Sequence, residues 1–160
     1  MYSFIDLETS GFSPVHDKII EIAIINYDGS NIIEEFESLI NPELLINEEI
    51  TEITGITNEM LLGKPVFKDI SDKIIEMTKD SIVVGHNIKF DYSFLQNEFN
   101  GIGINYYAYT VCTLKLSREK LPEVKSHSME SLKNHFYIDI ENNHRAKNDA
   151  LSVLELYKKL

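Results

Sequence analysis

Three stretches near the start of the chain have the hydrophobic pattern of β-strands. They are Tyr2–Asp6, Lys18–Tyr27 and Ile32–Ile40, and the second is almost continuously apolar and rich in β-branched residues, which is typical of a central strand. Asp28 and Gly29 separate the second stretch from the third, and this pair favours a tight hairpin turn. The pattern therefore predicts that the chain begins with an antiparallel meander of three strands.

The pattern then alternates between helices and strands. Asn47 and Gly55 bound a short predicted helix, as an N-cap and a C-terminal glycine. Antiparallel strands followed by α/β units predict one α/β domain over residues 1–160, with a mixed five-stranded sheet and helices on both faces. Further helices are expected at Phe67–Met77, Phe90–Phe99, Leu114–Lys120, Met129–Phe136 and Arg145–Leu160, and further strands at Ile82–Gly85 and Ile104–Tyr109.

Composition narrows the class of protein. A chain of 160 residues, 43% of them hydrophobic, fits one globular domain. The net charge of −11 argues against a protein that coats duplex DNA nonspecifically, which needs a basic face. The single cysteine, Cys112, excludes an intramolecular disulfide and a Cys-rich zinc module. Because there is no long apolar run and no secretory signal at the start, we expect a cytoplasmic protein without membrane contact.

The first predicted strand leads into two acidic residues, Asp6 and Glu8. Residues two apart in a strand point to the same face, so the two carboxylates project together. Neighbouring carboxylates repel unless a cation holds them, and hard cations such as Mg²⁺ prefer oxygen ligands. An isolated pair of this kind is more often a pair of solvated acids, so the metal interpretation depends on other parts of the chain.

Two later segments supply further candidate residues. His86 and Asn87 follow a buried strand and precede Asp91, which taken alone fits an acid placed in the first turn of a helix by the helix dipole. Within one helix, His144 and Asp149 would lie about 140° apart. We therefore expect His144 in the loop before the last helix and Asp149 one turn inside it. Taken alone, His144 fits a surface loop histidine.

Three segments together form a more specific pattern. Phe4–Gly11 (FIDLETSG), His86–Asp91 (HNIKFD) and His144–Asp149 (HRAKND) resemble the three motifs of the DnaQ-like 3′→5′ exonucleases of the DEDDh class. Phe36–Pro42 and Ile53–Thr57 extend the resemblance over nearly the whole chain. Within that family, the similarity is to the epsilon subunits of bacterial DNA polymerase III and to the exonuclease segments of replicative polymerases. The resemblance implies an RNase H-like fold.

The resemblance also implies roles for individual residues. Two divalent metal ions, Mg²⁺ or Mn²⁺, would be the cofactors. The metal ligands would be Asp6, Glu8, Asp91 and Asp149, and the general base would be His144. The residues around the terminal nucleotide would be Thr9, Gly11, Phe12, His86, Asn87 and Phe90.

The implied activity is metal-dependent 3′→5′ hydrolysis of single-stranded or frayed DNA to nucleoside 5′-monophosphates, in proofreading or repair, with a DNA polymerase as a candidate partner. Two alternatives stay open: an exoribonuclease of the oligoribonuclease or tRNA-trimming type, and a catalytically silent module that docks on a polymerase. The intact set of four acids and one histidine weighs against the silent module. The negative net charge is compatible with a DNA substrate, because Thr110–Lys147 contains seven Lys/Arg against five Asp/Glu.

Overall fold

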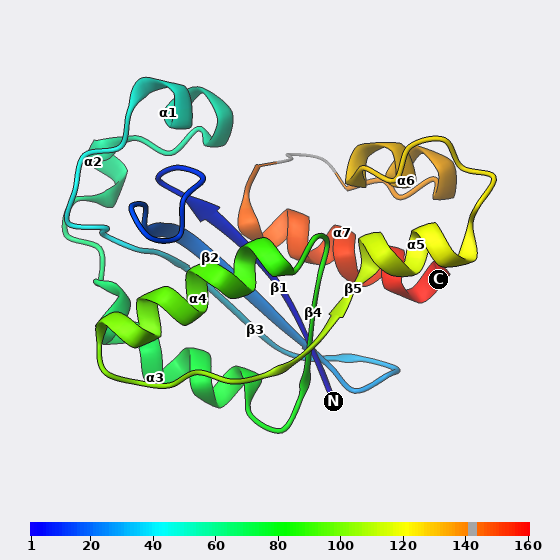
Figure 1. Cartoon of the computed structure of the whole chain (residues 1–160), viewed down its shortest axis with the longest axis horizontal. Helices are drawn as coiled ribbons and strands as arrows, with labels where there is room; N and C mark the ends of the chain where they lie inside the picture. The colour runs from blue at the N-terminus through cyan, green and yellow to red at the C-terminus, as the bar shows by residue number, and fades with distance from the viewer. Residues whose placement is uncertain (141–143) are drawn as a thin grey trace.

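The computed structural model describes residues 1–140 and 144–160, and its centre is a five-stranded sheet (Figure 1). The first three strands form the expected antiparallel meander, whereas the last two run parallel to the first. The sheet is therefore mixed, as the sequence predicts, and its strand order is β3-β2-β1-β4-β5. The strands are β1 (Tyr2–Thr9), β2 (Ile19–Tyr27), β3 (Ile32–Leu39), β4 (Ile82–Gly85) and β5 (Tyr109–Cys112).

Seven helices complete the described part of the chain. The expected caps of the first helix are confirmed: the Asn47 side chain accepts a hydrogen bond from the Ile50 backbone, and Gly55 ends the helix at φ 70°. None of the described helices is long and apolar enough to cross a membrane. The helices are α1 (Glu48–Thr54), α2 (Asn58–Leu61), α3 (Phe67–Thr78), α4 (Lys89–Gly101), α5 (Thr113–Lys120), α6 (Met129–Phe136) and α7 (Ala146–Lys159).

The two faces of the sheet carry separate hydrophobic cores, which confirms the predicted layers. On one face, Ile5 of β1 belongs to a cluster with side chains of α3 and α4, including Phe94. On the other face, Phe4 packs with Ala150 and Leu154 of α7. Successive residues of a strand point to opposite faces, so Asp6 and Glu8, two and four residues after Phe4, project toward α7.

One predicted element needs correction, and one observed element was not predicted. The strand expected at Ile104–Tyr109 is wrong, because β5 begins only at Tyr109, where pairing with β4 starts. The preceding segment is apolar for another reason: Ile104 and Tyr106 pack on the α3–α4 core without joining the sheet. The sequence also gave no signal for α2, whose four residues are too few to show a helical period.

Candidate active site

Three acidic side chains meet where the end of β1 approaches the first turn of α7. Carboxylate oxygens of Asp6, Glu8 and Asp149 all lie within 4.8 Å of one another. The strand places the first two on one face, and α7 brings the third over that face. The small side chains of Ala146 and Ala150, both fully buried, allow the helix to lie close to the sheet.

The surroundings of these carboxylates disfavour their charged forms. Burial raises the pKa of Asp6 well above its ordinary value, and repulsion from Asp91 and Asp149 raises it further. Burial and the charge of Asp149 raise the pKa of Glu8 to about 8. Burial also raises the pKa of Asp149, against the lowering effect of a hydrogen bond from the His144 backbone. Three crowded carboxylates whose ionisation is unfavourable fit a binding site for a divalent cation. A bound cation would stabilise their charged forms.

His144 lies in the position expected for it, in the segment before α7 and outside the helix. Its backbone N–H donates to Oδ2 of Asp149 at 2.7 Å, and its φ of 66° lies in the left-handed region. Together with the three clustered acids it lines a cavity of about 260 Å³. The histidine predicted as the general base therefore shares one cavity with the clustered carboxylates.

Asp91 approaches the three clustered acids from α4, which packs on the face of the sheet opposite to α7. It lies in the first turn of α4 and is 5% exposed. Burial raises its pKa to about 7, while hydrogen bonds from its own backbone and that of Leu7 oppose the rise. Its charge repels that of Asp6 more strongly than any other acid does, but it is outside the cluster of three carboxylates. The structure thus places Asp91 beside the cluster rather than within it.

Of the three residues expected from the HNIKFD segment to contact a nucleotide, one lines the cavity. The imidazole of His86 contacts Oγ1 of Thr113 through Nδ1 and the carbonyl of His127 through Nε2, both at 3.0 Å. Asn87 is exposed at φ 62°, and Phe90 is partly buried against the α3–α4 core. The nucleotide-contacting roles of all three stay predictions.

The loop after β1 is held in a compact shape that exposes one aromatic ring. The Thr9 hydroxyl donates to the carbonyl of Gly11 at 2.6 Å, and the Asp17 carboxylate accepts from the backbone of Ser13 at 2.9 Å. A Cβ atom on Gly11 would lie 2.4 Å from that carboxylate, so a larger residue here would force the Asp17 side chain to move. The loop leaves Phe12 69% exposed, free to contact a bound ligand.

The sequence analysis missed an ion pair beside the cluster. Glu21 of β2 lies directly across from Glu8 in the sheet and is fully buried. Its carboxylate accepts from Arg145 at 2.7 Å. A charged residue within a largely apolar strand was the available signal. Met129 and Val153, apolar residues that also line the cavity, gave none.

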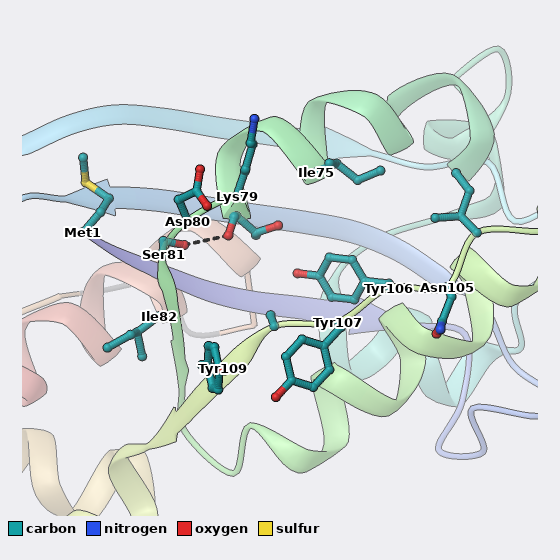
Figure 2. Close-up of a pocket in the computed structure, with 13 residues that line it drawn as sticks. Met1, Ile75, Lys79, Asp80, Ser81, Ile82, Asn105, Tyr106, Tyr107 and Tyr109 are labelled. Atoms are coloured by element: carbon teal, nitrogen blue, oxygen red, sulfur yellow. Dashed lines mark hydrogen bonds between the residues drawn. The ribbon is translucent and has the colours of Figure 1, made fainter.

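A larger cavity of about 730 Å³ lies away from these residues, where β4 and β5 begin (Figure 2). Tyr106, Tyr107 and Tyr109 line it together with Met1, and its single carboxylate among the described residues is that of Asp80. Because a lone acid offers little to a divalent ion, the smaller cavity is the better candidate for chemistry.

The fold and the site together define a class of protein. A mixed sheet with carboxylates gathered at the end of its first strand is the arrangement expected for an RNase H-like fold. The structure of E. coli exonuclease I in complex with a dT13 oligonucleotide superposes with a TM-score of 0.89 over 99% of this chain and 40% of that chain, at 22% identity. This similarity establishes the fold.

The sequence comparisons establish the family. The family described as "Exonuclease" matches residues 3–157, and the chain belongs to it. Over 157 residues the chain is 34% identical to the DNA polymerase III subunit epsilon of Aquifex aeolicus, covering 98% of this chain and 78% of that protein. It is also 32% identical over 155 residues to the PolC-type DNA polymerase III of Caldanaerobacter subterraneus. That alignment includes 97% of this chain but only 11% of the length of the relative.

Proposed function

We propose that this chain is a metal-dependent 3′→5′ exonuclease that removes nucleoside 5′-monophosphates from single-stranded or frayed DNA. The observation that carries the proposal is the cluster of Asp6, Glu8 and Asp149 oxygens in one cavity with His144. Family membership supports hydrolysis at a chain end. A catalytically silent docking module would have no chemical need for carboxylates held at raised pKa values.

The proposed cofactors are two Mg²⁺ or Mn²⁺ ions. Asp6, Glu8 and Asp149 would hold one ion, and Asp91 with Asp6 would hold the other, because Asp91 lies beside Asp6 but outside the cluster. When bound, such ions neutralise charge on the scissile phosphate and make a coordinated water more acidic. Their ligand set consists of oxygen atoms alone, which suits these hard cations.

The residues of the chain supply proton transfer and orientation. A ring nitrogen of His144 would accept the proton of the attacking water, a task for which imidazole is suited near neutral pH. As the new P–O bond forms, the bond from phosphorus to the 3′ oxygen of the preceding nucleotide breaks, leaving a 3′-hydroxyl on the shortened strand. Phe12, exposed in the loop after β1, would stack on the terminal base.

The substrate and partner proposals rest on the relatives and on charge. The Aquifex relative is named as a polymerase subunit, and the E. coli neighbour is bound to a dT13 oligonucleotide. Thr113, at the start of α5, contacts His86 in the cavity, and α5 carries Lys115, Arg118 and Lys120. A strand leaving the cavity along α5 would meet these cations. We further propose one exonuclease domain over residues 1–160, acting in the cytoplasm and able to associate with a DNA polymerase.

Matched DNA and RNA oligonucleotides labelled on the 3′-terminal nucleotide test this function. With Mg²⁺ or Mn²⁺, we expect labelled mononucleotide from single-stranded DNA as the first product, and none from Asp149→Asn. Glu52→Gln removes one exposed carboxylate on α1 and is the matched control, with wild-type activity expected. Faster release from RNA would favour the exoribonuclease alternative, and no release from either substrate would favour the docking module.

A further inference from the structure

Glu21 is a buried charge that the proposed chemistry does not use. It is the third residue of β2, a strand in which every residue is buried, and its side chain is fully inaccessible. Removing a carboxylate from water is energetically costly unless charged partners and hydrogen-bond donors replace the lost hydration. The groups that contact the Glu21 carboxylate should therefore explain how its charge is stabilised inside the protein.

Both oxygens of Glu21 are bound by the start of α7. Arg145 donates through Nε and Nη2 to Oε1, at 3.0 and 2.7 Å, and its Nε also lies 3.3 Å from Oε2. The backbone N–H of Ala146 donates to Oε2 at 3.0 Å. The partners are 124 and 125 residues away in the sequence. One carboxylate thus ties the first residues of the helix to the sheet in two places.

The contacts of Glu21 with Arg145 and Ala146, which we call the buried tie, replace a missing side-chain cap at the start of α7. Arg145 is the N-cap residue of α7, and its side chain makes no capping hydrogen bond. The N–H of Ala146 lies in the first turn of α7, where backbone donors have no partner within the helix. Glu21 accepts the hydrogen bond of this N–H from β2. A negative charge at this point also favours the helix dipole. Glu21 therefore acts as an N-cap supplied by a different element.

The same contacts determine the position of two candidate catalytic groups. His144 directly precedes the tied residues, and its backbone is held on the other side by Asp149, one turn into α7. Asp6 and Glu8 belong to β1, the neighbour of β2 in the sheet. Glu21 therefore connects the part of the site carried by the sheet to the part carried by the helix.

Direct metal binding by Glu21 is the competing explanation, and its contacts argue against it. Both of its oxygens already accept hydrogen bonds from Arg145 or Ala146. It is also absent from the cluster of described acids whose oxygens lie within 4.8 Å of one another. Binding a metal ion would require Glu21 to break the bidentate pair.

We infer that Glu21 is a positioning residue, which through Arg145 and Ala146 holds His144 and Asp149 in register with Asp6 and Glu8. The expected loss of hydrolysis rests on the proposed function, whereas the expected change in the structure around the start of α7 does not. Replacing a residue that orients a catalytic group or a metal ligand typically lowers activity or metal affinity about 10–100-fold. The expected defect is in the rate of hydrolysis rather than in oligonucleotide binding.

The test compares Glu21→Gln with Arg145→Lys in the full chain, well below each variant's melting temperature. Glu21→Gln keeps the side-chain volume but loses the charge, and Arg145→Lys keeps the charge but cannot form the bidentate pair. We expect both to lower kcat about 10–100-fold, with KM for a DNA oligonucleotide little changed. Amide hydrogen exchange over residues 146–149 should become about tenfold faster in both variants, a readout independent of activity.

Glu35→Gln is the matched control. It breaks the Glu35–Lys147 ion pair, which also joins the sheet to the first turn of α7, but both side chains of that pair are about 40% exposed. An exposed pair contributes little, so wild-type kcat and exchange are expected. A defect in Glu35→Gln as large as in Glu21→Gln would overturn the specific role of the buried tie.

The remaining outcomes separate the inference from the proposed function. Faster exchange with unchanged kcat in Glu21→Gln would overturn the positioning role and leave only a structural one. Wild-type kcat in Arg145→Lys would also overturn it, because charge alone would then suffice. If wild-type protein hydrolyses no nucleic acid but the exchange result holds, the proposed function fails while the tie of α7 to the sheet stands.

Discussion

Metal removal should make the stability of this protein depend on pH in an unusual direction. A carboxyl group whose pKa is higher in the folded protein than in the unfolded chain binds more protons when folded. Its contribution to stability is therefore fully present at low pH and lost as the pH rises through the folded pKa. Glu8, with a pKa raised from 4.5 to about 8, predicts that the metal-free protein becomes less stable as the pH rises from 4.5 to 8.

The size of the effect follows from the pKa of Glu8. At about 1.4 kcal/mol per pKa unit, the rise in the pKa of Glu8 corresponds to at most about 5 kcal/mol. Glu8 is partly exposed, so solvent screening and local relaxation reduce this figure, and we expect about 1–2 kcal/mol between pH 5.5 and pH 8. For a chain of this length that is a fall in melting temperature of about 2–8 °C.

Thermal melting in EDTA at pH 5.5 and pH 8, at constant ionic strength, measures this fall. Glu8→Gln cannot ionise and should lose most of the pH dependence. Glu52→Gln removes an exposed charge remote from the cluster and should keep it, which controls for net charge. Adding Mg²⁺ or Mn²⁺ should raise the melting temperature more at pH 8 than at pH 5.5, because ions bind the ionised carboxylates.

Two results would refute this reasoning. Metal-free wild type that melts at the same or a higher temperature at pH 8 would show that the clustered acids carry no electrostatic cost. A fall of equal size in wild type and Glu8→Gln would assign the pH dependence to other groups.

Three further predictions concern the same site. Asp6→Ala should reduce hydrolysis of labelled DNA to a few per cent or less, and higher activity would reject its assignment as a ligand. His144→Ala should lower kcat about 10²–10⁴-fold with oligonucleotide Kd little changed, whereas weak binding with normal kcat would make it a substrate contact. Gly11→Ala should raise KM roughly tenfold in steady-state assays, because the new Cβ displaces Asp17 and the loop carrying Phe12; an unchanged KM would contradict that role.

Local pattern was sufficient for much of the fold. The apolar run in β2 and the Asp28–Gly29 turn predict the meander, because strand period and turn chemistry are properties of neighbouring residues. It failed at Tyr106, which is apolar and buried but outside the sheet. Burial alone does not distinguish a strand from an extended segment packed on a core, since only pairing with β4 defines where β5 begins.

The site shows the same division between local and distant information. The expected separation of His144 from Asp149 follows from helix geometry alone, and the structure confirms that His144 precedes α7. The pairing of Glu21 with Arg145 could not be predicted, because it joins residues far apart in the sequence and depends on how α7 lies on the sheet. A buried acid in a strand indicates that a partner exists, but not which one.

The two buried alanines of α7 act as spacers between a helix and a sheet that each carry part of the proposed site. With Ala146 and Ala150 at the joint, the helix lies low enough for Asp149 to reach the acids of β1. A bulkier side chain at either position would lift the helix and widen the gap between the two halves. The chain would then keep every proposed catalytic group and still be inactive, because the proposed chemistry depends on the thickness of one layer of side chains.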